Sequence, residues 1–484
     1  MPDSFDRFNG QFLFSTDREA IPPAWVQHEQ AGWIIATHPD LPVTSLVSQN
    51  RTCIGWLIGY AITDTTFCPE EIMIQPHHSH DEIALEATLA DLGGRFVAVL
   101  LTATHQRCYL DTCGSMSAVY STLMPIVAST PSLIDIATHP WDEKLISDLQ
   151  MPNSGLWYPF GLTARQHVAR MIPNHYLHLP TMQLVRYWPT ASLLYSQGSV
   201  DNALATITTT MRHTITTVAS QYPLYMNLTA GRDSRMVLAC ARDVCDRTIF
   251  FTFTLRRDTA DAHIARVLAQ RFNLQHLQLR KIYADPVALD VWQEKTGRSI
   301  AGEIWKMHTT MHNLDPKRVI MPGMAGEVGR GFYWYPTDTG ATPLTPADLV
   351  ARCHLPWHPR FAAPAQAWLD SLPTTNTFCR LDLLYLEQRL GCWGGPQCYG
   401  GDARNITTIQ VFPLAHRKIF EAMFALPIDY RREQRLAVDI CRAVWPELTR
   451  LPYNQFSGFW RYPRKVAKYG LTLARSLVRR IQHL

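Results

Sequence analysis

The sequence lacks several features that would assign it to common protein classes. Its 484 residues contain no apolar run of the roughly 18 residues that span a bilayer, which excludes a membrane-spanning helix. The first residues include acids and no apolar stretch, so we expect no secretory signal. A charge surplus is missing too. The 45 basic and 41 acidic side chains leave a net charge of +4, too little to predict bulk nucleic-acid binding.

Closely spaced cysteine pairs are also missing. The eleven cysteines include no Cys-x-x-Cys pair, which is typical of reduced thiols in a cytoplasmic protein rather than of a disulfide framework. We therefore expect a cytoplasmic location and no structural zinc site. The densest histidine group, His77, His78 and His80, precedes Asp81 and Glu82. We interpret it as a polar loop before a helix rather than as a metal site.

Residues 1–195 predict a first domain built mainly of strands and turns. Short apolar runs typical of strands occur there, at 56–59, 96–101 and 175–179. Residues 81–92 have helical spacing and are followed by Gly93-Gly94, which predicts that the helix stops at these glycines. A stretch rich in Ser, Gly and Asp then marks a domain boundary near residues 190–200.

Residues 196–484 predict a second domain with a different pattern. Strand-like and helix-like segments alternate there with short loops, with strands at 224–228, 248–253 and 318–321 and helices at 200–220, 234–243 and 259–272. This alternation predicts a parallel sheet with helices on both faces, followed beyond about residue 340 by a mostly helical part. The fold class expected from these patterns is α/β.

One segment of the second domain has the pattern of an anion-binding loop. It runs from a strand through small and hydroxyl residues into a helix start, Leu228-Thr229-Ala230-Gly231-Arg232-Asp233-Ser234-Arg235. Backbone N–H groups and the positive end of the helix would face an anion, and Thr229, Ser234 and Arg235 would add side-chain donors. Asp233 suits such a site if Mg²⁺ bridges it to phosphate. The alternative is an ordinary turn with an Asp or Ser cap.

This loop resembles the PP-loop, Ser-Gly-Gly-x-Asp-Ser, of N-type ATP pyrophosphatases, and more narrowly the C-terminal domain of the asparagine synthetase family. Three later segments have the order and spacing of that family's motifs, namely 261–276, Gly323-Met324-Ala325-Gly326-Glu327 and 412–427. The resemblance implies that ATP and Mg²⁺ are the cofactors. It places ATP on Leu228, Thr229, Ala230, Gly231, Arg232, Asp233, Ser234, Phe253 and Gly323, and Mg²⁺ on Asp233 and Glu327.

The first domain is similar to the family's glutaminase-like, Ntn-type α+β sandwich. The similar segments are 94–99, Asp111 to Tyr120, and Gly161 to Leu177. In the family, glutaminase activity requires Cys at position 2, where this sequence has Pro2. The resemblance therefore implies a degenerate domain at 1–195 that does not release ammonia from glutamine, and a PP-loop synthetase domain at 196–484.

Relatives without that cysteine include β-lactam synthetases and lasso-peptide macrocyclases, which adenylate a carboxylate that an amine of the same molecule attacks. We expect a macrocyclase that joins a peptide's N-terminal amine to an internal Asp or Glu side chain. The implied partners are a core peptide, a leader peptidase and a leader-binding protein. The alternatives are a ligase of the amidotransferase or β-lactam synthetase type that acts on a small acid, and a catalytically dead scaffold.

Two departures from the family leave roles to be filled. Met324 stands where relatives often carry a polar residue, and Pro452 stands at the place of a late lysine. The candidate replacement cations are Arg431, Arg432, Arg435, Arg461 and Lys465, among which Arg435 is our choice. The candidate bases for the incoming amine are Glu303, His308, Tyr333 and Tyr335, among which Glu303 is our choice.

The C-terminal tail is basic and partly apolar. Residues 459–484 carry seven Lys and Arg side chains and no acid. Such a helix could touch an anionic membrane surface or an acidic leader peptide, or pack on the domain with a solvated basic face.

Overall fold

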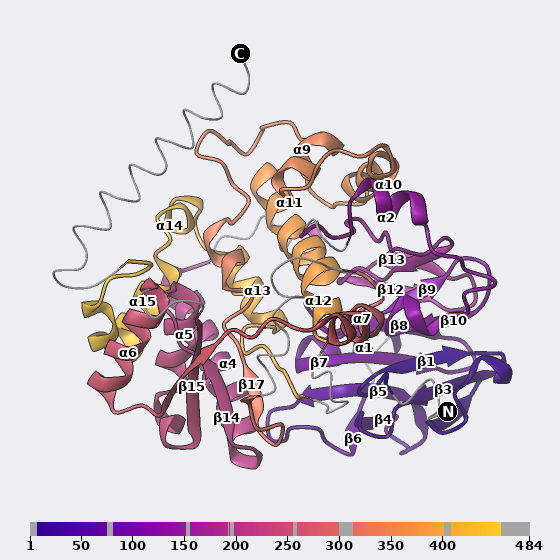
Figure 1. The fold of residues 1–484 in the computed structure, drawn as a ribbon, viewed down its shortest axis with the longest axis horizontal. Coiled ribbons are helices and arrows are strands. Elements are labelled where there is room, and N and C mark those ends of the chain that lie inside the picture. Colours follow the sequence, from indigo (N-terminus) through magenta and orange to yellow (C-terminus); the bar gives the residue numbers. More distant parts are fainter. Residues whose placement is uncertain are drawn as a thin grey trace.

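The computed structural model describes residues 7–74, 81–151, 155–191, 193, 198–254, 259–299, 313–400 and 408–455 (Figure 1). Over these residues the chain is a mixed α/β protein with two largely antiparallel sheets and one parallel sheet. None of the described helices has both the length and the apolar character needed to cross a membrane. The histidines at 77–80 and the tail at 459–484 lie outside the described residues.

The first antiparallel sheet has six strands in the order β11-β9-β10-β1-β3-β2. Its strands are β1 (Phe12–Ser15), β2 (Val26–Gln30), β3 (Trp33–Thr37), β9 (Val119–Ser121), β10 (Ile126–Ala128) and β11 (Val168–Arg170). Hydrophobic side chains occupy both of its faces, because one face packs on the second sheet and the other is covered by loops.

The second sheet has seven strands in the order β13-β12-β8-β7-β5-β4-β6, with only β4 and β6 parallel. Its strands are β4 (Val43–Val47), β5 (Cys53–Ile62), β6 (Glu71–Met73), β7 (Gly93–Leu101), β8 (Gln106–Leu110), β12 (His175–His178) and β13 (Gln183–Arg186). Phe12 and Phe14 of the first sheet share one core with Ile58 and Val97 of the second, so the two sheets pack face to face. Helix α1 (Asp81–Ala90) covers the outer face of the second sheet with Leu85 and Leu89.

The predicted helix is confirmed over Asp81–Ala90, and it ends two residues before Gly93, so the two glycines do not cap it. Gly93 and Gly94 begin strand β7 rather than capping α1. Gly94 has a φ of +113°, and a Cβ there would lie 2.0 Å from the carbonyl oxygen of Tyr60 on the paired strand. The glycine is required by close strand pairing, which a local helix-stop pattern does not reveal.

The parallel sheet has four strands in the order β16-β15-β14-β17. They are β14 (Leu224–Asn227), β15 (Thr248–Thr254), β16 (His276–Arg280) and β17 (Val319–Met321). Helices α4 (Val200–Gln221), α5 (Arg232–Cys240) and α6 (Ala260–Phe272) bury their apolar faces in one core with Leu224, Met226 and Phe250. The parallel sheet predicted from strand–helix alternation is therefore confirmed.

The opposite face of the parallel sheet forms a separate small cluster. Tyr225, Phe251, Leu279 and Ile320 pack there with Leu314, which lies in no helix or strand. Within the described residues, the core that contains α4, α5 and α6 thus lies on one face of the sheet. Residues 300–312, which precede Leu314, lie outside the described residues, so the predicted helices on the second face stay a prediction.

The described residues beyond about 340 are mostly helical, as predicted. The chain after β17 contains 3-10 helix η5 (Gly326–Arg330), α9 (Pro346–Arg352), α10 (Pro359–Asp370), α11 (Thr377–Leu383), π-helix η6 (Leu384–Gly394), α12 (Gly395–Gln397), α13 (Arg417–Phe424), α14 (Ile428–Arg432) and α15 (Leu436–Val444). Figure 1 shows α11 and α12 between the antiparallel sheets on one side and the parallel sheet on the other. The largest core cluster includes residues of both halves of the chain, the half with the two antiparallel sheets and the half with the parallel sheet and the later helices.

A buried network around Glu387 joins the β12–β13 hairpin to the helical part. The Glu387 side chain has no exposed surface and pairs with Arg186, whose guanidinium nitrogens lie 2.6 and 2.9 Å from its two oxygens. Asn174 and the indole N–H of Trp368 donate to the same carboxylate at 3.1 and 2.7 Å. Arg417 in turn donates to the side-chain oxygen of Asn174 at 2.7 Å. The two halves are thus held together by charged groups removed from water.

His416 forms a second contact between the halves and caps helix α13. It is 6% exposed, and its Nδ1 accepts a hydrogen bond from the backbone N–H of Lys418. Lys418 pairs with Asp91, in the turn after α1, at 2.9 Å. Burial, together with the charge of Lys418, lowers the pKa of His416 to about 4. A protonated His416 ring cannot accept the capping hydrogen bond, so protonation of His416 destabilises the folded protein.

We expect the stability of the protein to fall as the pH drops from about 6.5 towards 4, with a contribution of about 3 kcal/mol from His416. In the unfolded chain His416 binds a proton as the pH falls below its ordinary pKa of about 6.5. In the folded protein it binds that proton only near pH 4. Urea unfolding midpoints of wild type and His416→Asn at pH 7 and pH 5 measure the effect, because Asn keeps a capping oxygen and does not titrate.

The matched control for this prediction is His354→Asn. His354 is exposed and also has a positive φ, of 58°, which Asn tolerates. His354→Asn should follow the wild-type pH dependence, while His416→Asn should show a shallower one. Equal slopes for wild type and His416→Asn would contradict the assignment.

Candidate functional site

Two loops meet at the carboxyl edge of the parallel sheet. Strand β14 ends at Asn227 and leads through residues 228–231 into α5, and the neighbouring strand β17 leads into η5. Glycines allow the loops to touch. A Cβ on Gly323 would lie 3.0 Å from the backbone of Asp233, and one on Gly326 would lie 2.4 Å from the Oδ1 atom of Asp233. Larger side chains at 323 and 326 would therefore push the second loop away from the start of α5.

This contact brings the two predicted carboxylates to one cation. Asp233 lies in the first turn of α5 and Glu327 in the first turn of η5. The Arg330 guanidinium donates a hydrogen bond to Oδ2 of Asp233 at 2.8 Å and lies 3.1 Å from Oε1 of Glu327. The three side chains are 14–24% exposed, so little water screens them. The sequence prediction that Asp233 and Glu327 lie close together agrees with this geometry.

The charges of the cluster alter its protonation. Burial and the charge of Glu327 raise the pKa of Asp233 to about 6, against the opposing effect of Arg330. Burial and the charge of Glu327 raise the pKa of the Tyr385 hydroxyl well above its usual value. Tyr385, in η6, therefore remains neutral beside the carboxylates. A cation brought near the pair would favour ionised Asp233.

The donor set suits Mg²⁺ held partly by a substrate. The Tyr385 hydroxyl interacts with the Glu327 carboxylate, but its Oε2 atom is buried and has no hydrogen-bond partner, which leaves this oxygen available to a ligand. No group of three or more His, Cys, Asp and Glu side chains among the described residues could form a complete metal site. Two carboxylates alone match the usual binding of Mg²⁺, which takes one or two carboxylates and completes its shell with water and phosphate oxygens.

The loop at 228–231 is held in shape from within. Thr229 and Ser234 share a hydroxyl hydrogen bond of 2.7 Å, and the N–H of Gly231 donates to Oγ1 of Thr229 at 3.0 Å. The N–H of Ala230 donates to Oδ1 of Asp261, on α6, at 2.9 Å. The N–H groups of Ala230 and Gly231 are thus engaged, and the first turn of α5, which starts at Arg232, is left to face an anion.

The expectation that Arg235 faces an anion is wrong. Arg235 has no exposed surface, and its guanidinium donates to backbone carbonyls of Ala230, Leu448, Leu451 and Pro452. It ties the loop to the C-terminal segment rather than binding a ligand. The sequence did not predict that the Arg235 side chain, near the end of the first turn of α5, points into the protein.

The other predicted nucleotide contacts lie around the same edge. Leu228 is buried and continues the strand pairing through its N–H to the carbonyl of Phe251. Arg232 lies with its guanidinium carbon 5.6 Å from the ring centre of Tyr453, and its Nε is buried without a partner. Phe253 lies near the end of β15, partly buried, with its ring centre 5.1 Å from that of Phe251. These positions are compatible with a nucleotide at the sheet edge.

The predicted late cation and base are not brought to the cluster. Arg435 is half exposed and lies near Glu433 and Asp439, at 3.8 and 3.4 Å, whereas the cation beside the two carboxylates is Arg330. Arg431 is buried, pairs with Asp382 at 2.7 Å and supports η5 through the carbonyl of Val328.

The remaining candidates stay outside the cluster or outside the described residues. Arg432 donates to the carbonyl of Asp338. Tyr333 is buried and forms no hydrogen bond with either described carboxylate of the cluster, but its ring centre lies 5.9 Å from that of Tyr385. Tyr335 is 46% exposed and packs against Arg352. Glu303, His308, Arg461 and Lys465 lie outside the described residues. We therefore assign no residue as the base for the incoming amine.

Two residues of the site were missed by the sequence analysis, Arg330 and Tyr385. Arg330 follows Glu327 by three positions, which on one helical turn places both side chains on the same side. That spacing was a usable signal. Tyr385 is 58 positions away and reaches Glu327 only through the packing of η6, which no local pattern indicates.

No protein-family model matches the chain, and no curated protein matches it.

Proposed function

We propose that the protein is an ATP- and Mg²⁺-dependent ligase of the lasso-peptide macrocyclase type. The single observation that carries this proposal is the meeting of Asp233 and Glu327 at the N-terminus of α5, with an unpartnered carboxylate oxygen on Glu327. A peptide carboxylate would attack the α-phosphate of ATP and release pyrophosphate. The peptide's N-terminal amine would then attack the acyl carbon and release AMP, forming an isopeptide ring.

Each part of the site has a task in this reaction. Asp233 and Glu327 would hold Mg²⁺, which when bound neutralises phosphate charge and helps pyrophosphate to leave. The first turn of α5 orients the phosphates through its N–H groups and positive end. Arg330 keeps the two carboxylates aligned beside each other and limits their mutual repulsion. Holding both ends of one peptide replaces a collision by an intramolecular step, an effect of about 7–11 kcal/mol on the barrier.

The two-part organisation supports an intramolecular amine rather than ammonia. We assign residues 1–195 to a glutaminase-like sandwich and 196–484 to the synthetase part. The two packed antiparallel sheets are compatible with the first assignment. Pro2 stands where the resembled glutaminases require a cysteine, and it has no thiol. We place the reaction in the cytoplasm, with a leader peptidase and a leader-binding protein supplying the free core peptide.

The test is mass spectrometry of a candidate precursor peptide co-expressed with this protein and a leader peptidase. The proposal expects a cleaved core that is lighter by one water and resists carboxypeptidase beyond the ring. In vitro, the linear core should give AMP and pyrophosphate in equal amounts, and only with Mg²⁺ present. ADP and phosphate instead would contradict adenylation.

A small-acid ligase is separated from a macrocyclase by the substrate that stimulates AMP release. Linear peptides with an internal Asp or Glu should stimulate it, and the corresponding Asn or Gln peptides should not. Stimulation by free amino acids alone would replace the macrocyclase by a small-acid ligase. Absence of ATP turnover with every acid tested would favour the scaffold.

A further inference from the structure

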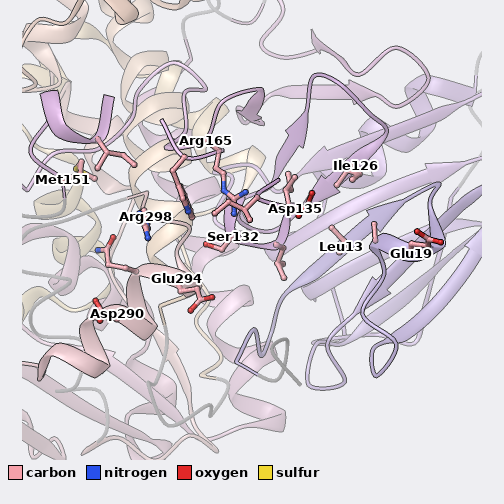
Figure 2. A pocket seen from close by; sticks show the side chains of 17 residues that line it. Leu13, Glu19, Ile126, Ser132, Asp135, Met151, Arg165, Asp290, Glu294 and Arg298 are labelled. Atoms are coloured by element: carbon pink, nitrogen blue, oxygen red, sulfur yellow. The ribbon is translucent and has the colours of Figure 1, made fainter. Parts of the chain in front are cut away.

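A large cavity lies away from the carboxylate cluster, on the outer side of the six-stranded sheet. Its volume is about 920 Å³, near the upper end of the range for pockets that enclose a small ligand. It opens between β1, β10, the segment 131–141 and helix α7 (Pro286–Lys295). Figure 2 shows Leu13 and Ile126 towards one end and Arg165 and Arg298 towards the other.

The cavity has an apolar wall. About half of its lining residues are hydrophobic, among them Leu13, Ile126, Leu133, Ile134 and Trp141. Leu133 and Ile134 belong to the small core on the outer face of the sheet, so this wall rests on fixed structure. An occupant with apolar side chains would remove this surface from water.

Two arginines with no carboxylate partner among the described residues face the cavity. The guanidinium carbons of Arg165 and Arg298 lie 4.2 and 4.3 Å from the ring centre of Trp141. Arg165 is 6% exposed and donates one hydrogen bond, to the carbonyl of His139, while its buried Nε has no partner. Arg298 is exposed. Burial and the charge of Arg298 lower the pKa of Arg165 to about 10, as expected for two cations near each other.

A third unpartnered donor lies beside them. The hydroxyl of Ser132 is buried, lines the cavity and has no hydrogen-bond partner. Figure 2 places Ser132 between Arg165 and Glu294. Two guanidinium groups and a hydroxyl thus line one cavity, and guanidinium N–H groups are the donors that pair best with the oxygens of a carboxylate.

The acids of the cavity occupy its rim. Glu19, Asp135 and Asp290 are exposed, and Glu294 pairs with Arg7. Asp135 accepts hydrogen bonds from backbone N–H groups of its own turn, at Ala137 and Thr138. Among the described residues none of these acids forms an ion pair with Arg165 or Arg298, but the charge of Asp135 favours the charged form of Arg165. The exposed acids present negative charge at the opening.

We propose that this cavity binds the C-terminal segment of a peptide, with its free carboxylate on Arg165, Arg298 and Ser132. The apolar wall takes the hydrophobic side chains before the carboxylate, and the acidic rim takes a basic side chain or amide N–H groups further up. A fatty acid would satisfy the arginines and the wall but would leave the acidic rim without a partner. The choice of the peptide substrate as the occupant rests on the proposed function.

The test is fluorescence anisotropy with two peptide probes, fluorescein-Gly-Lys-Leu-Phe-Gly-Ile with a free carboxylate and the same peptide as its C-terminal amide. The full-length protein is used without ATP or Mg²⁺. The carboxylate probe should bind at least about tenfold more tightly than the amide. Arg298→Gln should reduce that ratio to near one, and Ser132→Ala should reduce it in part.

Matched controls separate binding at the cavity from general charge effects. Arg242 is also an exposed arginine stacked on a tryptophan, 5.2 Å from the ring of Trp445, but it lies in the other half of the chain. Arg242→Gln should keep the full preference for the carboxylate. Because Arg298 and Ser132 are peripheral to the core, their variants avoid the risk that an Arg165 variant fails to fold.

Equal affinity for the two probes, or a preference that survives Arg298→Gln, would overturn the proposal. Displacement by dodecanoate with no binding of either peptide would assign the cavity to a fatty acid instead. Since the assay needs no ATP, loss of peptide binding with intact ring formation would remove only this site. Peptide binding without AMP formation would remove only the ligase.

Discussion

Asp233→Asn should lower the rate of AMP formation at least about 100-fold, the loss typical of removing one preorganised electrostatic group. In the proposed reaction, asparagine would keep the size of the side chain but could not share charge with Glu327 in holding Mg²⁺. Glu327→Gln should cause a comparable loss. The double variant should fall little below either single one, because residues that act on one group are strongly non-additive. Single-turnover assays with saturating peptide measure the effect.

Asp233→Asn should not lower the stability of the protein, although it lowers the activity. Burial and the charge of Glu327 raise the pKa of Asp233 to about 6, so ionisation of this side chain works against the folded state at neutral pH. Replacing it by neutral asparagine removes that cost, while Arg330 keeps Glu327 as a partner. We therefore expect an unfolding midpoint equal to or above that of the wild type. A residue with only a structural task would not combine lost activity with kept stability.

Asp246→Asn is the matched control, since Asp246 is exposed in the 3-10 turn that follows α5. It should leave both activity and stability unchanged. Full activity of Asp233→Asn would contradict the proposed task of this carboxylate. A large loss of stability in Asp233→Asn would make it a structural ion-pair residue instead.

Glu387→Leu should destabilise the protein by about 3–5 kcal/mol, the cost typical of removing one partner of a buried ion pair. The substitution leaves Arg186, whose side chain is 10% exposed, without its counter-charge, and leaves the indole N–H of Trp368 without an acceptor. Urea unfolding followed by circular dichroism measures the loss. Glu71→Leu is the control, because its pair with Arg51 is exposed and should contribute less than about 1 kcal/mol.

A double variant distinguishes charge from packing in the same network. Arg186→Met combined with Glu387→Leu removes both charges and should recover part of the lost stability. The charge of Arg186 and its hydrogen bonds outweigh burial and lower the pKa of Glu387. The carboxylate therefore stabilises the fold above its unfolded pKa, and this contribution is lost only as the pH falls through the lower folded value. No recovery in the double variant would contradict the charge explanation.

Local patterns were enough to predict the elements that carry the site. Strand β14, the turn at 228–231 and helix α5 follow from an apolar run, small residues and helical spacing within about 17 residues. The pairing of Asp233 with Glu327 was also accessible, because β14 and β17 were both predicted as parallel strands and their carboxyl ends share one sheet edge.

What the sequence could not predict depends on contacts between distant residues. Gly94 appeared to end a helix, but its conformation is set by Tyr60 on a paired strand. Arg435 was chosen as the late cation from its position in the chain, whereas the cation at the carboxylates is Arg330. Glu387 carried no recognisable motif, and its importance comes from partners that fold around it from positions 174, 186 and 368.

The Glu387 network can form only late in the synthesis of the chain. Arg186 and Glu387 are 201 positions apart, and a ribosome adds about 5–20 residues each second. The β12–β13 hairpin therefore leaves the ribosome roughly 10–40 seconds before its carboxylate partner exists. During that interval Arg186, which the folded protein almost entirely buries, and the apolar surface around it are exposed to water. While the chain is being made, its first part therefore lacks a partner that stabilises it in the folded protein. Until residue 387 emerges from the ribosome, this part is open to aggregation and to chaperone binding.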